Sequence, residues 1–159
     1  MRPIVNAGYD GGMKRKEIFS LISPLVEQLY QFAFALLPDE LEAEQLVIDG
    51  VNGFIIKEKK LLESLEVEID NELRRFFFQK MVGHIYSLAN KRIMQFKLNH
   101  EDPFYRLPLR DRAIMTLRYQ MNYAPENIED FLGIARWEVI EGIHNSRFML
   151  TNQFQENEL

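Results

Sequence analysis

The chain has 159 residues, 47% of them hydrophobic and 12% aromatic, so its composition suits a packed core and not a disordered protein. It has no cysteine, which excludes disulfides, thiolate zinc sites and cysteine nucleophiles. The formal net charge of −5 is unusual for a nucleic-acid-binding protein. No apolar run approaches the ~20 residues of a membrane span, so the sequence predicts a cytoplasmic protein without a membrane segment.

The N-terminal part predicts helices separated by proline and glycine. Residues 1–12 are rich in glycine and proline and predict a loose arm. A short helix is expected at 17–22, and Ser23 with Pro24 is expected to cap a buried helix that extends to residue 37. Pro38 and Asp39 then begin another helix, whose end Gly50 and Gly53 are expected to weaken. Its predicted inner face consists of Leu41, Leu46, Val47, Val51, Phe54 and Ile55.

The remainder of the chain is also predicted to be helical. A helix is expected from residue 71 to about residue 98, followed by a polar linker at 99–106. Three shorter helices are expected at 109–120, 125–132 and 135–150, with Gly133 placed to adopt a left-handed backbone between the last two. No segment alternates polar and apolar residues convincingly, so the fold class is all-α.

The last three predicted helices have the pattern of a helix-turn-helix, in which a glycine turn joins two short helices on an apolar base. The base is predicted to contain Leu117, Met121, Ile128, Phe131, Leu132, Ile134, Val139 and Ile143. Short helical hairpins with a glycine turn are also common in proteins that bind no DNA. The pattern alone therefore leaves both functions open.

Charge is distributed in two blocks. Residues 38–72 contain eleven acidic and three basic residues, whereas residues 74–97 contain six basic residues and no acidic one. Adjacent blocks of opposite charge indicate two faces with different partners. The alternative is that the charges are spread over solvated helix faces.

The C-terminal segment resembles region four of the extracytoplasmic-function (group four) sigma factors. The matching residues are Leu107-Pro108-Leu109-Arg110-Asp111-Arg112-Ala113, Leu117-Arg118-Tyr119, Asn122-Tyr123, Ile128, Leu132-Gly133-Ile134 and Val139. In that family, the last helix of this region contacts the minus-thirty-five promoter element. The resemblance thus implies a divergent sigma factor that binds core RNA polymerase and promoter DNA and directs transcription initiation.

The N-terminal part is similar to region two of the same family. Leu29-Tyr30-Gln31-Phe32-Ala33 resembles its start, and residues 42–49 resemble the acidic helix that binds the polymerase clamp. The resemblance implies polymerase-binding roles for Glu42, Glu44, Gln45 and Asp49. It implies DNA-binding roles for Arg74, Arg75, Lys80, Lys91, Arg92, Arg136, Trp137, Glu138, His144 and Arg147. Cations that hold phosphates and aromatic rings that stack on melted bases suit that task.

The sequence departs from the family pattern in the last helix. Ile140 and Gly142 occupy positions where the family usually has a lysine and an arginine, and the formal charge of residues 135–150 is zero. Glu138 is expected either to accept a hydrogen bond from cytosine or to cap the helix. Trp137 is expected to pack at the start of the helix, with an exposed contact as the alternative. In region two, Met81 replaces a family tryptophan.

The predicted organisation is a region two-like domain at 1–98, a linker at 99–106 and a region four-like domain at 107–159. No catalytic set, metal site or cofactor motif is found, so the protein is not predicted to be an enzyme. Predicted partners are core polymerase and promoter DNA, with an anti-sigma factor left open. Alternative functions are a sigma-like regulator that has lost promoter recognition and a helical protein-interaction module.

Overall fold

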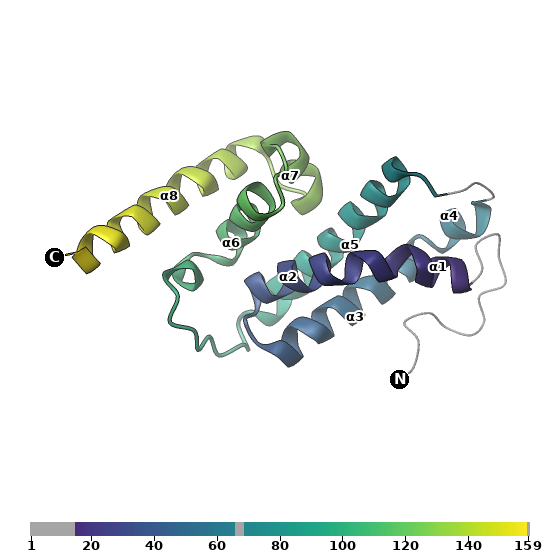
Figure 1. The fold of residues 1–159 in the computed structure, drawn as a ribbon, viewed down its shortest axis with the longest axis horizontal. Coiled ribbons are helices and arrows are strands. Elements are labelled where there is room, and N and C mark those ends of the chain that lie inside the picture. Colours follow the sequence, from purple (N-terminus) through teal and green to yellow (C-terminus); the bar gives the residue numbers. More distant parts are fainter. Residues whose placement is uncertain (1–14, 66–68, 159) are drawn as a thin grey trace.

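The computed structural model describes residues 15–65 and 69–158, and within these ranges the chain is helical and forms no β-strand (Figure 1). The all-α prediction is therefore confirmed for the described residues. The predicted loose arm at 1–12 lies outside them.

The N-terminal helices pack around α3 and α5. They are α1 (Arg15–Ile22), the 3-10 turn η1 (Ser23–Leu25), α2 (Val26–Leu36), α3 (Glu40–Lys57), α4 (Lys59–Ser64) and α5 (Asn71–Arg92). Helix α3 contacts both α2 and α5, and α2 also contacts α5. Figure 1 shows α1 and α2 following one another along one side of this group.

Aspartate side chains mark the beginnings of two of these helices. Asp39 accepts hydrogen bonds from the amides of Leu41 and Glu42, both at 3.0 Å, and Asp70 accepts one from Leu73 at 2.8 Å. Such caps satisfy amides that have no partner within the helix. The expected cap at Ser23 is wrong, because the chain is already helical at Ile22 and no side chain caps η1.

One prediction for α3 is wrong. Leu41 is not part of the inner face, since it is 76% exposed in the first turn of the helix. Gly50 and Gly53 do not end the helix, since α3 continues to Lys57. A Cβ atom on Gly50 would lie only 2.5 Å from Cγ1 of Ile85, so this glycine allows α3 and α5 to approach closely.

The C-terminal helices follow a long connection. Helix α5 ends at Arg92, earlier than the predicted residue 98. The remaining elements are η2 (Pro103–Arg106), α6 (Leu109–Met115), η3 (Thr116–Gln120), α7 (Pro125–Leu132) and α8 (Arg136–Glu158). The helix predicted at 109–120 changes to π-helical geometry in η3, where the amide of Met121 donates to the carbonyl of Thr116 at 3.1 Å.

The two halves share one hydrophobic core. Helix α2 contacts α6, α5 contacts α7, and α8 packs on α6 and α7. Phe78 of α5 stacks on Tyr123 with ring centroids 6.3 Å apart and meets the edge of Phe131 at 5.9 Å. The division into two domains remains a prediction. The helices of the two predicted domains are in direct contact.

Although the sequence was not expected to contain an apolar run of membrane-spanning length, one helical run, Glu17–Leu36, is long and apolar enough to cross a membrane by length and composition. It is the only such run among the described residues. Buried core helices of other proteins meet the same criterion. Leu21, Leu29, Phe32 and Leu36 of this run are buried in the core described above.

Candidate functional site

The turn between α7 and α8 depends on Gly133. Its φ of 66° places it in the left-handed region, as the sequence predicts. Its amide donates to the carbonyl of Glu129 at 2.8 Å, and the amide of Ile134 donates to the same oxygen at 3.2 Å. Since a Cβ on Gly133 would meet no atom within 4 Å, glycine is needed here for its backbone angle and not for space.

The base beneath this turn is apolar, as predicted. Leu117, Ile128, Phe131, Leu132 and Val139 are buried, while Met121, Ile134 and Ile143 pack against the core from its edge. Helix α8 is thereby fixed to the base by one face only. Its opposite face remains open to solvent.

Gly142 lies on the packed face of α8. A Cβ at this position would be 2.5 Å from Cδ1 of Ile114 and 2.9 Å from Oδ1 of Asp111, both on α6. Ser146, one turn later on the same face, is fully buried. These small residues allow α8 to approach α6 closely. Gly142, where the resemblance to the sigma factors would place an arginine, thus faces the protein interior.

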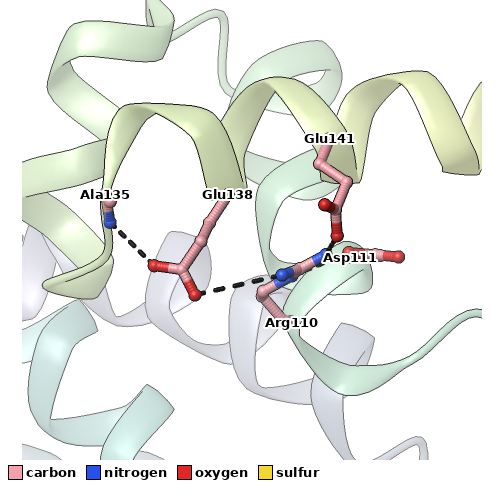
Figure 2. A network of polar contacts seen from close by, with 5 residues as sticks. All are labelled: Arg110, Asp111, Ala135, Glu138 and Glu141. Atoms are coloured by element: carbon pink, nitrogen blue, oxygen red, sulfur yellow. Dashed lines mark hydrogen bonds and ion pairs between the residues drawn. The ribbon is translucent and has the colours of Figure 1, made fainter.

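Arg110 of α6 joins the beginning of α8 to the base (Figure 2). Its guanidinium donates to Glu141 at 3.1 Å and to Asp111 at 3.1 Å, and it lies 4.0 Å from Glu138. Glu138 also accepts a hydrogen bond from the amide of Ala135 at 2.8 Å. Of the two roles expected for Glu138, the structure therefore shows the cap.

This network favours the charged form of Arg110. Burial alone would lower its pKa, but the hydrogen bonds that Arg110 donates to Glu141 and Asp111, together with the negative charges of these carboxylates, outweigh burial, so the pKa is raised. Asp111 is itself buried, at 3% exposure. Glu138 and Glu141, in the first two turns of α8, therefore both face the guanidinium of Arg110.

The open face of α8 bears a stripe of large side chains. Trp137, Ile140 and Phe148 are 63%, 54% and 66% exposed, and His144 is also exposed. Spacings of three, four and four residues place these four side chains, which we call the outer stripe, on one face of the helix. The expectation that Trp137 packs is wrong, because the base is filled by Val139 and its neighbours.

The two arginines predicted to contact DNA from α8 lie at its surface and already have partners. Arg136 donates to Glu129 of α7 at 3.2 Å. Arg147 donates to the hydroxyl of Tyr119, and its guanidinium lies 5.2 Å from the centroid of that ring. Exposed contacts of this kind are weak and exchange with solvent, so both cations stay accessible to an anion.

The predicted basic helix corresponds to α5. Arg74, Arg75 and Lys91 are exposed, and Lys80 is partly buried. Arg75 lies 5.7 Å from the ring of Tyr123, and Lys80 lies 5.3 Å from that of Phe76. Phe76 is 38% exposed, whereas Phe77 and Phe78 are buried, so the three consecutive rings do not all face one core.

The acidic and basic blocks meet at an ion pair between α3 and α5. Nη2 of Arg92 on α5 lies 2.6 Å from Oδ2 of Asp49 on α3, and both side chains are about one-third exposed. Gln45 donates to the other oxygen of Asp49 at 2.9 Å. A predicted polymerase-binding residue is therefore paired with a predicted DNA-binding residue. Glu42 and Glu44 remain exposed on α3.

Arg112, which no sequence motif marked as functional by itself, is buried at 3% exposure. It donates to the carbonyl oxygens of Ala35, Leu36 and Leu107 at 2.9, 2.7 and 2.6 Å. An arginine among apolar positions of a short helix was the available signal, since arginine is rarely buried without partners. This side chain connects α2, the segment before α6, and α6 itself.

Comparison of the sequence with protein-family models and with curated proteins gives no match. In the described part of the chain, no group of three or more histidine, aspartate or glutamate side chains could hold a metal ion. A function is therefore inferred from the residues and their geometry.

Proposed function

We propose that this protein is a sigma-like transcription regulator that binds core RNA polymerase and promoter DNA. In this proposal α7, the Gly133 turn and α8 form a helix-turn-helix, with α8 as the recognition helix. The main support is the open face of α8, which begins with exposed Arg136 and Trp137 immediately after the turn. The first residues of a recognition helix are those that reach base edges in the major groove.

The α8 helix would make few phosphate contacts. Arg136 and Arg147 are its cations, and Glu138 and Glu141 are engaged by Arg110. Phosphate contacts supply most of the sequence-independent affinity for DNA. We therefore expect α8 to bind weakly alone and to rely on polymerase for its placement.

The N-terminal half would supply the remaining contacts. Arg74 and Arg75 are exposed near the start of α5, where they can hold phosphates of a single strand. Phe76 presents part of its ring beside Lys80, an arrangement suited to a stacked base. Glu42 and Glu44 lie on α3, so polymerase and DNA would meet different helices of the same half.

A transcription assay tests this proposal. The purified protein is mixed with bacterial core RNA polymerase and genomic promoter fragments from its source organism, and run-off transcripts are measured. We expect stable association with polymerase and initiation from a subset of promoters. Stable association without initiation from any promoter would contradict promoter recognition, and no association would contradict the whole proposal.

A specific observation favours a second candidate, a module that uses α8 to bind another protein. The outer stripe is apolar apart from His144, and exposed apolar patches commonly mark protein-binding surfaces. In this case the glycine turn and base serve only to present α8. Large apolar side chains at the centre of an interface supply most of its binding energy.

Substitution of Ile140 by lysine separates the two candidates. Ile140 is 54% exposed, so the change is compatible with the fold, and it restores a cation where the sigma family has one. If α8 binds DNA, Ile140→Lys should tighten binding and increase the dependence of log K on log salt by about 1. If α8 binds a protein, neither the wild type nor the Ile140→Lys variant should bind DNA measurably at any salt concentration. Trp137→Ala is the companion variant, which removes the largest side chain of the outer stripe without adding charge.

A further inference from the structure

An open pocket of about 480 Å³ lies between α2, η2 and the π-helical segment η3. We call it the aromatic pocket. Its lining consists of Tyr30, Gln31, Phe34, Ala35, Asp102, Phe104, Tyr105, Met115, Thr116, Tyr119 and Gln120. Three segments that are distant in the sequence thus enclose one space of the size that small ligands occupy.

Aromatic side chains dominate this lining. Tyr30 and Phe34 lie on one side with ring centroids 6.1 Å apart, and Phe104 and Tyr105 lie on another at 5.2 Å with perpendicular planes. Tyr119 completes the group and is 45% exposed. Tyr105 is buried and Tyr30, Phe34 and Phe104 are partly buried, so the pocket presents aromatic surface that a ligand can cover.

The lining contains one charged residue, the acid Asp102, and no cation. Burial, followed by Glu40, Glu44 and Asp39, raises the pKa of Tyr30. Burial and then Asp102 raise the pKa of Tyr105, while Arg112 acts in the opposite direction. Asp102 is thus the charged group of the lining itself. Arg112 lies behind the lining, with its guanidinium 5.8 Å from the centroid of Tyr105, and donates to backbone carbonyls.

The third wall is the π-helical segment η3. This geometry is rare, and short π-helical insertions are frequent at functional sites because they shift side chains out of the regular helical register. Here the segment places Thr116, Tyr119 and Gln120 in the lining. Gln120 also donates to Gln31 of α2 at 3.4 Å, which closes one end of the wall.

We propose that the aromatic pocket binds a small organic cation with an apolar body, such as a quaternary ammonium. Ring faces attract cations that have lost part of their water, and the carboxylate of Asp102 supplies the opposite charge. The guanidinium groups of Arg118 and Arg147 lie 5.8 and 5.2 Å from the centroid of Tyr119, so this ring is already paired with cations of the protein. The ligand would therefore be held by Asp102 and by the rings of Tyr30, Phe34 and Phe104. This site is independent of the function proposed above.

The test compares choline with 3,3-dimethylbutan-1-ol, in which a carbon atom replaces the charged nitrogen. Each compound is titrated into the full chain while aromatic resonances are followed by NMR. Choline should shift the resonances of pocket residues saturably, and the neutral compound should not. Equal shifts by both compounds would overturn the cationic class, and no saturable shift by choline into the tens of millimolar would overturn the site.

Two variants localise the binding. Asp102→Asn removes the charge but keeps an oxygen that can accept the 2.9 Å hydrogen bond from the amide of Phe104. Phe34→Leu removes a ring and keeps an apolar side chain. Each should raise the Kd for choline about 3- to 10-fold, as expected for loss of a partly exposed cation contact. Asp70→Asn is the matched control, since it makes the same change at the cap of α5 and should leave the Kd unchanged. If Asp102→Asn and Asp70→Asn bind choline alike, Asp102 is not part of the site and the proposal fails.

Discussion

Replacement of Arg112 by methionine should strongly destabilise the protein. The guanidinium binds two carbonyls at the end of α2, those of Ala35 and Leu36, that have no partner within the helix. Pro38 has no amide hydrogen, and the amide of Asp39 donates to Leu37, so the backbone that follows does not satisfy them. Arg112 is the group that does.

The size of the effect follows from these contacts. Methionine fills a similar volume but leaves the carbonyls of Ala35, Leu36 and Leu107 without their donor. Each buried acceptor that loses its partner costs about 1 kcal/mol or more, so we expect a loss of about 3 kcal/mol in the free energy of unfolding. That is a large fraction of the ~5–15 kcal/mol that stabilises a typical domain. Burial lowers the pKa of Arg112, because removing the guanidinium charge from water is unfavourable. This desolvation cost offsets part of the stabilisation that the hydrogen bonds of Arg112 provide.

Urea unfolding followed by circular dichroism measures this loss. Because Arg112 joins the C-terminal helices to α2, the variant should also unfold in a broader transition, as the two halves lose their coupling. Arg74→Met, at an exposed position of α5, is the control and should change stability by less than about 0.5 kcal/mol. An Arg112→Met protein as stable as this control would refute the role assigned to Arg112.

Three further predictions concern other positions. Gly142→Ala should lower the free energy of unfolding by about 1–3 kcal/mol, because the added methyl group meets Ile114 and Asp111. A variant with the same thermal unfolding as the wild type would contradict the close packing of α8 on α6. Gly133→Ala should cost about 1–2 kcal/mol through its left-handed backbone alone, with crystallographic or NMR structure otherwise unchanged; a neutral effect would mean that the turn relaxes to another geometry. Burial and then Lys57 lower the pKa of His84 below its ordinary 6.5, so the folded state disfavours its protonation. The unfolded chain therefore binds more protons as pH falls below about 6.5, and stability should decrease there. The free energy of unfolding, measured in urea at ~pH 7.5 and ~pH 5.5, should therefore fall less in the His84→Gln variant than in the wild type. An equal fall in both proteins would contradict the role assigned to His84.

The sequence by itself determined the all-helical class and most of the helix positions. Apolar residues repeated at helical spacing, and proline, aspartate and glycine marked where helices begin and end. These signals are local, because a cap or a left-handed turn depends on neighbouring residues only. The bounds of α7 and the conformation of Gly133 were predicted correctly for this reason.

What the tertiary structure decided depends on residues that are distant in the sequence. Gly50 was expected to weaken its helix, and Gly142 stands where the sigma factors usually have an arginine. In the structure, each of these glycines is the point where another helix approaches closely. Glu138 and Trp137 occupy neighbouring positions of α8, and only the position of Arg110 and the filled base show which turns inward and which outward. Periodicity shows that a helix has two faces, but the packing partner determines which face is covered.

The same limit applies to charge and to the pocket. The acidic and basic blocks are visible in the sequence, but their meeting at Asp49 and Arg92 is a consequence of how α3 lies on α5. The aromatic pocket is assembled from three segments separated by many residues, and no local pattern marks it. A helical chain determines its own turns and caps, whereas long-range packing alone brings side chains of different helices together into a surface or a cavity.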